Sequence, residues 1–572
     1  MSTIEFKESN CKNCYKCLRN CPVKAITFFE RQAAIVEDEC ILCGRCLSVC
    51  PQDAKKIRNY TDIVKKYIQK KEKVYVSLAP SFVSSFEQSP NWVFAVLKRL
   101  GFTGVEETAA GAVQVSRQYE RLMVEQKMAN IITTACPSVV MLVEKHYPEL
   151  IPYMAPVVSP MIAHAKMMRE TYGKKIKVVF IGPCIAKIEE YKDFRNDGAV
   201  DAILTYEELL DWIRSEGIDE NTDLSEELKS VEKNMARIYP TPGGIIKTIE
   251  KDSRKNYQCI TVDGIERCME ILESMKHDGL RSYFIEMNSC TGGCIGGPYR
   301  QQLPGGFLEA RRKLLNYVKE GMRDDHHAVI EDRNINFSKV FTDRSSKTPI
   351  PSEAVIQGIL NSTGKFTKAD ELNCGACGYA NCREKAIAVF REKAQLPMCM
   401  PYMRDRAESI SNLIINSTPN AIIALDNKMD IQELNKAARE MFLLDSRVAE
   451  GSSIFEILAC EDIARALRKK ENFYDKRFYY ADYDITVEQS VIWVEKHNIA
   501  VIICRNVSME EEKRRELFEI RRETVEIAQK VIDKQMRVAQ EIASLLGETT
   551  AETKVTLTRL KKSIMAEMSD ES

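Results

Sequence analysis

The feature that most constrains this chain is a short loop that holds two thiols among four glycines. Residues 286–298 read EMNSCTGGCIGGP and contain Cys290 and Cys294. The glycines of the loop are Gly292, Gly293, Gly296 and Gly297. Because glycine has no side chain, it lets the backbone take left-handed conformations and approach a bulky group closely. The loop therefore predicts a site for a large inorganic cofactor.

Two further cysteines follow apolar runs that are typical of buried strands. Cys136 comes after residues 131–134, and Cys184 comes after residues 178–181. A proline next to each cysteine marks a turn at the end of the strand. Open α/β sheets place ligands at such strand ends, so these thiols are predicted to lie at a binding site.

The three stretches together resemble the active-site loops of the iron-only (FeFe) hydrogenases. The resemblance spans roughly residues 75 to 320, including 200–205 and 242–244. It implies an H-cluster, in which a 4Fe-4S cubane is joined to a diiron unit with CO, cyanide and a bridging dithiolate amine. The implied cubane ligands are Cys136, Cys184, Cys290 and Cys294, and Cys294 also bridges to the diiron unit.

The resemblance implies further roles beside the diiron unit. Lys187 matches the family lysine that donates to a cyanide, and Ala79, Pro80 and Ser81 match the loop over the other side of the site. Ser159 is placed beside the cofactor as well. The predicted catalytic set is Cys294, Lys187, Ala135, Ser81, Asn288 and Gly182.

Several of these positions depart from catalytic hydrogenases. Ala135 stands where catalytic members have a cysteine that passes protons to the bridging amine, and a methyl group cannot relay a proton. Ala155 replaces a relay serine, and of the usual pair of acids Glu120 alone is a candidate. Gly182 and Asn288 stand where methionines pack beside the diiron unit, so the cofactor should be electronically unusual. The familiar proton route is predicted to be broken.

An alternative is that a different proton path keeps the protein a good catalyst. Glu106, Glu107 and Glu120 are candidates for that path, but surface acids of this kind are usually solvated. His164 lies on a helical run and is interpreted as a packed or exposed histidine rather than a relay. Cys268 is interpreted as an ordinary buried thiol.

Residues 1–57 contain two matching cysteine runs with the spacing x2, x2, x3, each followed by proline. This is the two-cluster pattern of bacterial ferredoxins, in which the fourth cysteine of each run serves the other cluster. The two 4Fe-4S clusters are assigned to Cys11, Cys14, Cys17 and Cys50, and to Cys40, Cys43, Cys46 and Cys21. The alternative of a zinc knuckle does not fit this spacing. Two close clusters predict a path for electrons.

Strand-like and helical runs alternate from Val74 onward, which predicts a parallel α/β domain over residues 58–350. The strand-like runs are 74–78, 131–134, 178–181 and 202–204, and the helical runs are 92–100 and 113–128. A polar, locally charged stretch from residue 321 to 351 is interpreted as a linker or surface excursion.

Residues 351–405 carry another cysteine set with the spacing x2, x4, x16. It resembles a small 4Fe-4S domain found in some corrinoid and electron-transport proteins. The implied ligands are Cys374, Cys377, Cys382 and Cys399. A four-cysteine zinc site is the alternative.

The C-terminal third has no cysteine cluster. Residues 406–508 resemble a PAS domain, with strands on both sides of a turn at Lys428, a helix opened by Asn435, and later strands at 479–490 and 491–504. Residues 509–572 predict a helical tail for signalling or dimerisation, because apolar residues recur at helical spacing up to residue 546. His497 is interpreted as part of a strand, so no phosphoacceptor histidine is predicted.

Composition bounds the remaining possibilities. A chain of 572 residues exceeds a single core, and the fold is predicted to be multidomain, α/β and α+β. Twenty cysteines in tight clusters indicate metal centres rather than disulfides. A net charge of −1 predicts no nucleic-acid partner, and the absence of a long apolar run or signal-peptide core predicts a cytoplasmic protein without a membrane contact.

These observations predict a hydrogen sensor. H2 and protons would react slowly at the H-cluster. Three further 4Fe-4S clusters, the PAS domain and the helical tail would then pass the redox state of the H-cluster to a kinase or phosphatase. Ferredoxin or another redox partner, FeFe maturation proteins and a second copy of the chain are the other expected partners. Two alternatives stay open: a catalytic, ferredoxin-linked hydrogenase, and an iron-sulfur homologue without a diiron unit.

Overall fold

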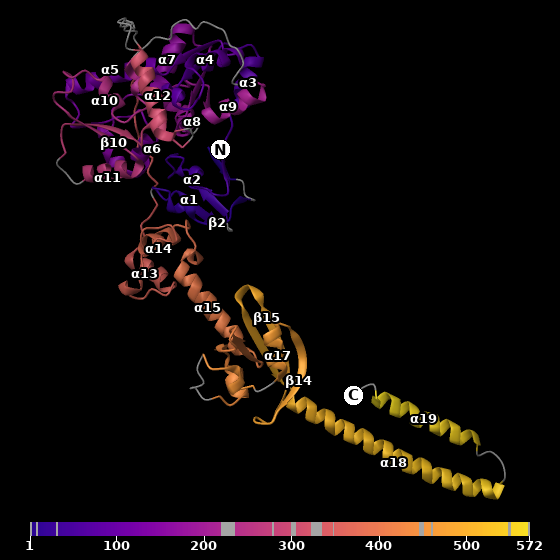
Figure 1. Cartoon of the computed structure of the whole chain (residues 1–572). Helices are drawn as coiled ribbons and strands as arrows, with labels where there is room; N and C mark the ends of the chain where they lie inside the picture. Colours follow the sequence, from indigo (N-terminus) through magenta and orange to yellow (C-terminus); the bar gives the residue numbers. More distant parts are fainter. Residues whose placement is uncertain are drawn as a thin grey trace. The chain divides into compact units, whose positions relative to one another are not determined.

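The computed structural model describes residues 3–6, 10–29, 32–218, 235–276, 280–298, 305–321, 335–346, 348–444, 451–458, 461–546 and 551–569. The chain forms two compact units, Met1–Met403 and Arg404–Ser572, whose elements are labelled in Figure 1. In the described residues, no helix is both long and apolar enough to cross a lipid bilayer.

The N-terminal domain consists of two antiparallel strand pairs and two short helices. Strand β1 pairs with β4, which brings the two ends of the domain together, and β2 pairs with β3. Each short helix begins inside one of the cysteine runs. The elements are β1 (Ile4–Phe6), α1 (Lys16–Arg19), β2 (Ile26–Phe29), β3 (Gln32–Ile35), α2 (Arg45–Ser48) and β4 (Lys55–Ile57).

The central domain contains two parallel sheets, with the strand orders β6-β5-β8-β9 and β10-β11-β7. Neighbouring strands are parallel throughout, which confirms the predicted parallel α/β pattern. Strands β5, β7, β8 and β9 coincide with predicted runs, whereas β6, β10 and β11 were not predicted. Their bounds are β5 (Val74–Leu78), β6 (Gly104–Glu107), β7 (Asn130–Ile132), β8 (Lys177–Gly182), β9 (Ala202–Thr205), β10 (Gln258–Asp263) and β11 (Tyr283–Asn288).

Helices connect the parallel strands. Both predicted helices form, and α5 begins four residues before its predicted start. Proline at the first helical position opens α4, α6 and α7, where its missing N–H costs nothing. The bounds are α3 (Thr61–Gln69), α4 (Pro90–Arg99), α5 (Ala109–Glu125), α6 (Pro137–His146), α7 (Pro160–Tyr172), α8 (Ala186–Lys192), α9 (Tyr206–Ser215), α10 (Gly244–Thr248), α11 (Ile265–Lys276) and α12 (Gly306–Gly321).

Residues 335–346, which we call the strap, run over the surface of the central domain, as the surface alternative of the sequence interpretation has it, but two of their side chains are anchored inside it. Phe337 is buried in the central core, and Ser338 pairs with Val157 in an isolated β-bridge. Lys339 is buried as well. The polar residues of the strap make ion pairs with the domain, which is why its composition looked like that of a linker. Residues 322–334 lie outside the described residues.

The four-cysteine domain contains α13 (Glu353–Asn361) and α14 (Cys382–Phe390). It has a small core of its own, made of Ile356, Leu360 and Ala386. Tyr379 and Met398 join a second core that includes Leu18 of the N-terminal domain. The two cysteine-rich domains are therefore packed together inside the first unit.

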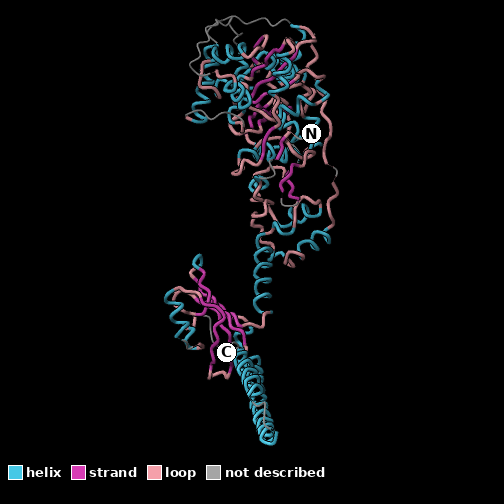
Figure 2. Tube along the Cα trace, turned by 90° about the vertical axis from the view of Figure 1, so that its right-hand side faces the viewer, coloured by secondary structure: helices cyan, strands magenta, loops and turns pink. Residues whose placement is uncertain are grey.

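The second unit is built on an antiparallel sheet, whose strands are drawn in magenta in Figure 2. The strand order is β13-β12-β16-β15-β14. Asn435 opens α16 as predicted, because its Oδ1 accepts the N–H of Ala438 at 2.8 Å. The predicted strand bounds at 479–490 and 491–504 are wrong, since turns interrupt both runs. His497 lies in one of these turns, Glu495–His497. The elements are α15 (Met400–Ser417), β12 (Ala421–Leu425), β13 (Ile431–Leu434), α16 (Lys436–Met441), α17 (Glu461–Lys469), β14 (Phe473–Tyr480), β15 (Ile485–Val494), β16 (Ile499–Asn506), α18 (Ser508–Leu546) and α19 (Ala551–Ser569).

Candidate functional site

A cavity of about 120 Å³ lies at the carboxyl ends of strands from both parallel sheets. Its walls come from the loops after β5, β6, β7, β8 and β11. Parallel sheets place their ligand-binding loops at this edge, which is why residues far apart in the sequence converge here. The four thiols predicted as cluster ligands all line it: Cys136, Cys184, Cys290 and Cys294.

The loop that carries two of these thiols owes its shape to glycine. Gly293 has a φ of +74°, and a Cβ atom there would lie 2.4 Å from the carbonyl oxygen of Pro240. At Gly296 a Cβ would lie 1.9 Å from the carbonyl oxygen of Thr291. Because both obstacles are backbone atoms, they cannot move aside cheaply, and these positions require glycine. The glycines thus allow close packing of the loop against other backbone segments, while the predicted approach to a cofactor stays a prediction.

Burial makes the cavity unfavourable for free thiolates. Burial, together with repulsion from neighbouring sulfurs, raises the pKa of Cys184 to about 11 and that of Cys294 to about 12. The pKa of Cys290 is raised for the same reasons. Cys294 is open to the cavity although protein atoms surround it. Metal-bound sulfur is a thiolate, so positively charged iron is the partner that would ionise thiols in such a place.

A buried polar atom in the cavity wall also fits a bound group. The Ser289 hydroxyl is buried and finds no hydrogen-bond partner among the described residues. Leaving such a group unsatisfied costs roughly 1 to 3 kcal/mol. Sulfide, CO and cyanide are all potential acceptors, so the residues present fit an H-cluster.

Lys187 extends from α8 to the cavity and is held by three oxygens. Its Nζ donates to Glu190 Oε2 at 2.7 Å, to Ser159 Oγ at 2.9 Å and to the Ala135 carbonyl at 3.4 Å. The Lys187 and Glu190 side chains are only 10% and 6% exposed, so they form a buried ion pair. Ser159, predicted to lie beside the cofactor, thus orients the ammonium group. The sequence did not identify Glu190.

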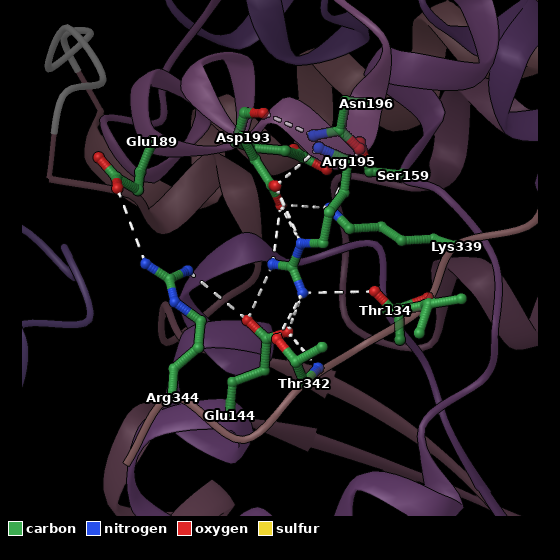
Figure 3. Close-up of polar contacts among 12 residues, drawn as sticks. Thr134, Glu144, Ser159, Glu189, Asp193, Arg195, Asn196, Lys339, Thr342 and Arg344 are labelled. Carbon is green, nitrogen blue, oxygen red and sulfur yellow. Dashed lines mark hydrogen bonds and ion pairs between the residues drawn. The ribbon is translucent and has the colours of Figure 1, made fainter. Parts of the chain in front are cut away.

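An ion-pair cluster fixes the turn after α8 against the strap, as Figure 3 shows. Arg195 Nη1 donates to Glu144 Oε1 at 2.6 Å, and Lys339 Nζ lies 3.1 Å from Asp193 Oδ2. Burial alone would raise the pKa of Asp193, but Arg195 and Lys339 outweigh it and lower the pKa to about 2. Lys339 also donates to Asn196 Oδ1 at 3.1 Å. The cluster stabilises the C-terminal end of the helix that carries the cavity lysine.

The loop after β5 closes the other side of the cavity with a 3-10 turn, Pro80–Ser84. Tyr206 OH donates to the Ala79 carbonyl at 3.0 Å and lies 2.7 Å from Ser81 Oγ. Because the phenol hydrogen is used on the carbonyl, the Ser81 hydroxyl donates to the phenol oxygen. The predicted loop residues lie at the cavity, and Tyr206, which the sequence did not reveal, holds them in place.

Three of the positions that depart from catalytic hydrogenases, Gly182, Asn288 and Ala135, lie in or next to the cavity wall. A Cβ at Gly182 would lie 2.7 Å from the ring of Phe180, which itself lines the cavity. Asn288 lines the cavity and donates to Glu286 Oε1 at 3.4 Å. Ala135 contributes a methyl group to the wall and its carbonyl to the lysine. None of these three side chains can pass a proton at neutral pH.

Glu286 is a fully buried carboxyl at the end of β11. Its Oε2 accepts the backbone N–H of Ile246, at the beginning of α10, at 3.0 Å. Burial raises its pKa to about 7, even though hydrogen bonds from Ile246 and Gly243 oppose the shift. The carboxyl therefore titrates near neutral pH.

We expect Glu286→Gln to stabilise the protein at high pH and to have only a small effect on its stability near pH 5. The pKa of Glu286 is about 7 in the folded protein, compared with the ordinary value of 4.5, which we take for the unfolded chain. The carboxyl therefore binds its proton more tightly in the folded state. Stability is therefore lost as pH rises from the unfolded to the folded pKa, by about 3 kcal/mol in total. Thermal unfolding measured from about pH 5 to about pH 9 should show the difference opening toward pH 7 and then staying constant. Glu270→Gln, on the exposed face of α11, is the matched control, and parallel curves for wild type and Glu286→Gln would contradict the expectation.

In the N-terminal domain, the last cysteine of the first run lies near the sulfurs of the second run. Burial, and then the sulfurs of Cys43 and Cys40, raise the pKa of Cys21 to about 12. Cys21 therefore lies beside the second cysteine run, where the ferredoxin pattern would have it bind the cluster of that run. The backbone N–H of residue 25 donates to Cys21 Sγ at 3.3 Å, and that of residue 54 donates to Cys50 Sγ at 3.4 Å. Amide hydrogen bonds to sulfur are a common means of tuning cluster potential.

The second cysteine run also borders the four-thiol cavity. Cys43 lines the same cavity as Cys290. A Cβ at Gly44 would lie 2.5 Å from Cγ of Pro298, so the two loops are in close contact. Arg45 and Glu266 form an ion pair across the same interface. A cluster on the second run would therefore be the immediate neighbour of one in the cavity.

A second pocket contains the remaining predicted ligands. Its thiols are accompanied by two lysines, and Lys365 Nζ donates to Cys399 Sγ at 3.4 Å. Burial lowers the pKa of Lys385. Ammonium groups beside four sulfurs would balance the negative charge of a thiolate-bound cluster. The thiols of the pocket are Cys374, Cys377, Cys382 and Cys399.

Arg19 bridges the four-cysteine domain to the N-terminal domain. One guanidinium nitrogen donates to the Cys14 carbonyl at 3.0 Å, and the other donates to the Ala376 carbonyl at 3.2 Å. Gly378 also packs closely against Leu18. The loops that carry the two cysteine sets are therefore neighbours.

Comparison with known families agrees with this arrangement. Residues 72–298 match the C-terminal domain of the iron-only hydrogenase large subunit, residues 10–54 match the 4Fe-4S dicluster domain, and residues 370–401 match an Fe-S cluster family. Three separate regions of the chain are therefore similar to iron-sulfur families, and the region that forms the cavity, residues 72–298, is similar to the iron-only hydrogenase domain.

Individual relatives are distant. The periplasmic [Fe] hydrogenase large subunit of Nitratidesulfovibrio vulgaris is 26% identical over 40% of this chain and 67% of that protein. The cytosolic Fe-S cluster assembly factor NAR1 of Vanderwaltozyma polyspora is 27% identical over 32% of this chain and 36% of that protein. A solved variant of [FeFe]-hydrogenase HydA1 from Chlamydomonas reinhardtii has 15% identity and a TM-score of 0.39, and covers 50% of this chain and 100% of that chain. The chain spans 56% to 67% of the length of the first hydrogenases that it matches.

Proposed function

We propose that the protein is a hydrogen-sensing FeFe hydrogenase that reacts slowly with H2 and passes its redox state to a signalling partner. The observation that carries the proposal is the methyl group of Ala135 in a cavity that retains four thiols and Lys187. The groups that would hold the cofactor are present, while the thiol that passes protons in catalytic relatives is replaced. Positioned proton relays contribute about 10² to 10⁴-fold in rate, so this combination favours slow turnover.

An H-cluster bound in the cavity would supply the reversible splitting of H2 into protons and electrons. The four cysteines would hold its cubane, and Cys294, which is open to the cavity, would reach the diiron unit. Lys187 would direct its ammonium group to a cyanide, with Glu190 and Ser159 fixing its orientation. The turn Pro80–Ser84 would exclude water from the opposite side.

Three further 4Fe-4S clusters would carry electrons away from the cavity. The cluster on the second N-terminal run would be first, because Cys43 borders the cavity. The other N-terminal cluster would follow, and Arg19 joins its loop to that of the four-cysteine domain. Ferredoxin or another redox protein would exchange electrons with this relay.

We propose that the second unit is a PAS-type module with a dimerisation helix. The strand order of its sheet and the helix α18 support this assignment. On α18, Leu517, Ile520, Ile527 and Val531 are more than half exposed at the 3-4 spacing of a coiled-coil seam. A second copy of the chain would cover this seam, and a cytoplasmic kinase or phosphatase would read the output. FeFe maturation proteins would install the diiron unit.

Two other functions have specific support. Hydrogenase relatives favour a catalytic enzyme linked to ferredoxin, for which Ala135 would be bypassed by another proton path. The likeness to NAR1 favours an iron-sulfur protein without a diiron unit. Lys187 argues against this second alternative. It is held at the cavity by a buried ion pair, and in a protein without a diiron unit it would have no cyanide to bind.

Infrared spectra of the matured protein under H2 and under inert gas, recorded together with H2 turnover, test the proposal. We expect CO and cyanide bands that shift with H2, together with feeble turnover. Bands with fast turnover would replace the sensor by an enzyme with an unfamiliar proton path. Absence of the bands from fully matured protein would leave the NAR1-like alternative.

A further inference from the structure

A chain of hydrogen bonds connects the cavity wall to solvent on the side of β6. Thr108 lines the cavity, and its Oγ1 lies 2.8 Å from Ser77 Oγ. Ser77 Oγ lies 2.8 Å from His164 Nδ1, and His164 Nε2 lies 3.1 Å from Glu106 Oε2. Ser77, Thr108 and His164 are buried, whereas the Glu106 side chain is 36% exposed. The four side chains therefore form a continuous path between the cavity and water.

The direction of these hydrogen bonds follows from their outer end. A carboxylate can only accept, so the Glu106 oxygen receives the Nε2–H of His164. The histidine Nδ1 is then an acceptor, and it receives the Ser77 hydroxyl hydrogen. The Ser77 oxygen in turn receives the hydroxyl hydrogen of Thr108. Every donor thus faces outward, and the remaining lone pair of Thr108 is the free acceptor at the inner end.

Close helix packing holds the central member of this path. A Cβ at Gly111 would lie 2.3 Å from the Pro160 carbonyl and 2.6 Å from the backbone nitrogen of His164. Only glycine lets α5 and α7 approach so closely, and this places His164 against strand β5, which carries Ser77. The sequence interpretation of His164 as an ordinary packed residue did not anticipate these two partners.

We propose that Thr108, Ser77, His164 and Glu106 form the proton exit that serves the cavity in place of the route interrupted at Ala135. The inference rests on the proposed function, because it needs a source of protons in the cavity. Splitting of one H2 releases two protons and two electrons, and the electrons leave through the iron-sulfur clusters to an external acceptor. Each proton that binds Thr108 Oγ1 displaces the hydroxyl hydrogen to Ser77, and from there one proton passes through the imidazole to Glu106 and into water. One proton enters and one leaves, and the path is reset when the hydroxyls rotate and the imidazole returns to the tautomer with its hydrogen on Nε2.

The charge of the outer group suits this role. Burial would raise the pKa of Glu106, but the hydrogen bond and charge of His164 outweigh it, and the pKa is lowered. Tyr172 also donates to this carboxylate, at 2.5 Å. Glu106 is therefore ionised at neutral pH and ready to accept a proton from the imidazole, while its exposed part releases protons to solvent.

Isotope exchange in the matured full-length protein tests the inference. Under D2 in ordinary water, formation of HD and H2 requires protons to reach the cavity but needs no external electron acceptor. We expect His164→Gln to slow this exchange by about 10²-fold, because an amide keeps the hydrogen bonds but cannot relay a proton. Glu106→Gln, at the partly exposed end, should slow it as well. His146→Gln is the matched control, since His146 is a half-buried histidine of the same domain that bonds the Glu39 carbonyl and not this path.

Infrared spectra and chemical rescue distinguish a relay from a structural role. In His164→Gln the CO and cyanide bands should keep their positions and intensities under H2 and only reach them more slowly. Added imidazole should restore exchange in His164→Ala and leave wild type unaffected. Wild-type exchange in both His164 variants, or slow exchange with altered bands and no rescue, would overturn the inference. Absence of bands from wild type would overturn the proposed function and the inference together, and is recognised before any variant is compared.

Discussion

Cys294→Ala should abolish the reaction with H2 while the clusters outside the cavity remain. Cys294 is open to the cavity and belongs to the loop whose glycines hold it in one conformation. An alanine there removes one of the four thiols and the only sulfur assigned to both parts of the H-cluster. Infrared spectra should therefore lose the CO and cyanide bands, and H2 turnover should fall to background. Electron paramagnetic resonance of the reduced protein should still show the ferredoxin-type clusters.

The matched control for this experiment is Cys268→Ala. Cys268 is also buried, and its thiol donates to the Asn288 carbonyl at 3.5 Å, but it is not part of the cavity wall. Its loss should leave the infrared bands unchanged. If Cys294→Ala kept those bands, the bridging role would be wrong and another residue would have to bind the diiron unit.

The convergence of four thiols on one cavity could be predicted from sequence because its signal is local. Spacing within a short loop determines which thiols point the same way, and prolines mark the strand ends that carry Cys136 and Cys184. The buried strands were predictable for the same reason, since β5 and β8 are continuous apolar runs. Strand β6 was not predictable in this way. Its sequence, GVEE, contains no apolar run, and it ends with two acids.

The partners of the cavity residues could not be predicted because they come from distant parts of the chain. Tyr206 bonds the loop after β5 across more than a hundred residues, and His164 bonds Ser77 across 87. Local composition was misleading at Glu107, which was interpreted as solvated. The structure buries it in an ion pair with Arg237, with a shortest distance of 2.5 Å. A charge that is paired inside the protein looks, in sequence, like a charge on the surface.

The strap is a second example of that ambiguity. Its polar, locally charged composition favoured a linker or surface excursion, yet Lys339 and Arg344 reach acids that precede them by more than a hundred residues. Only the fold brings these charges together. The same reasoning applies to the proposed proton path: the sequence offered Glu106 as one of three candidate acids, but its connection to the cavity through His164, Ser77 and Thr108 depends on contacts that only the fold creates.

Ala135→Cys should raise H2 turnover by at least about 10²-fold, the lower end of what a positioned relay contributes. The Ala135 methyl already lines the cavity, so a thiol at this position would extend into it, while the backbone carbonyl would keep its bond to Lys187. The gain should stay at the lower end because Ala155 still interrupts the path behind the thiol. Turnover with a viologen dye and infrared spectra of the same samples provide the measurement.

Ala135→Val separates the proton effect from the effect of size. Valine adds bulk to the cavity wall without an ionisable group, so it should leave turnover at or below that of wild type. Combining Ala135→Cys with His164→Gln then tells whether the thiol opens a route of its own. If the double variant keeps the gain, the new thiol reaches solvent independently of the path through Glu106. If Ala135→Cys has wild-type turnover with intact infrared bands, proton delivery at this position does not limit the reaction, and slow turnover must come from the electronic surroundings set by Gly182 and Asn288.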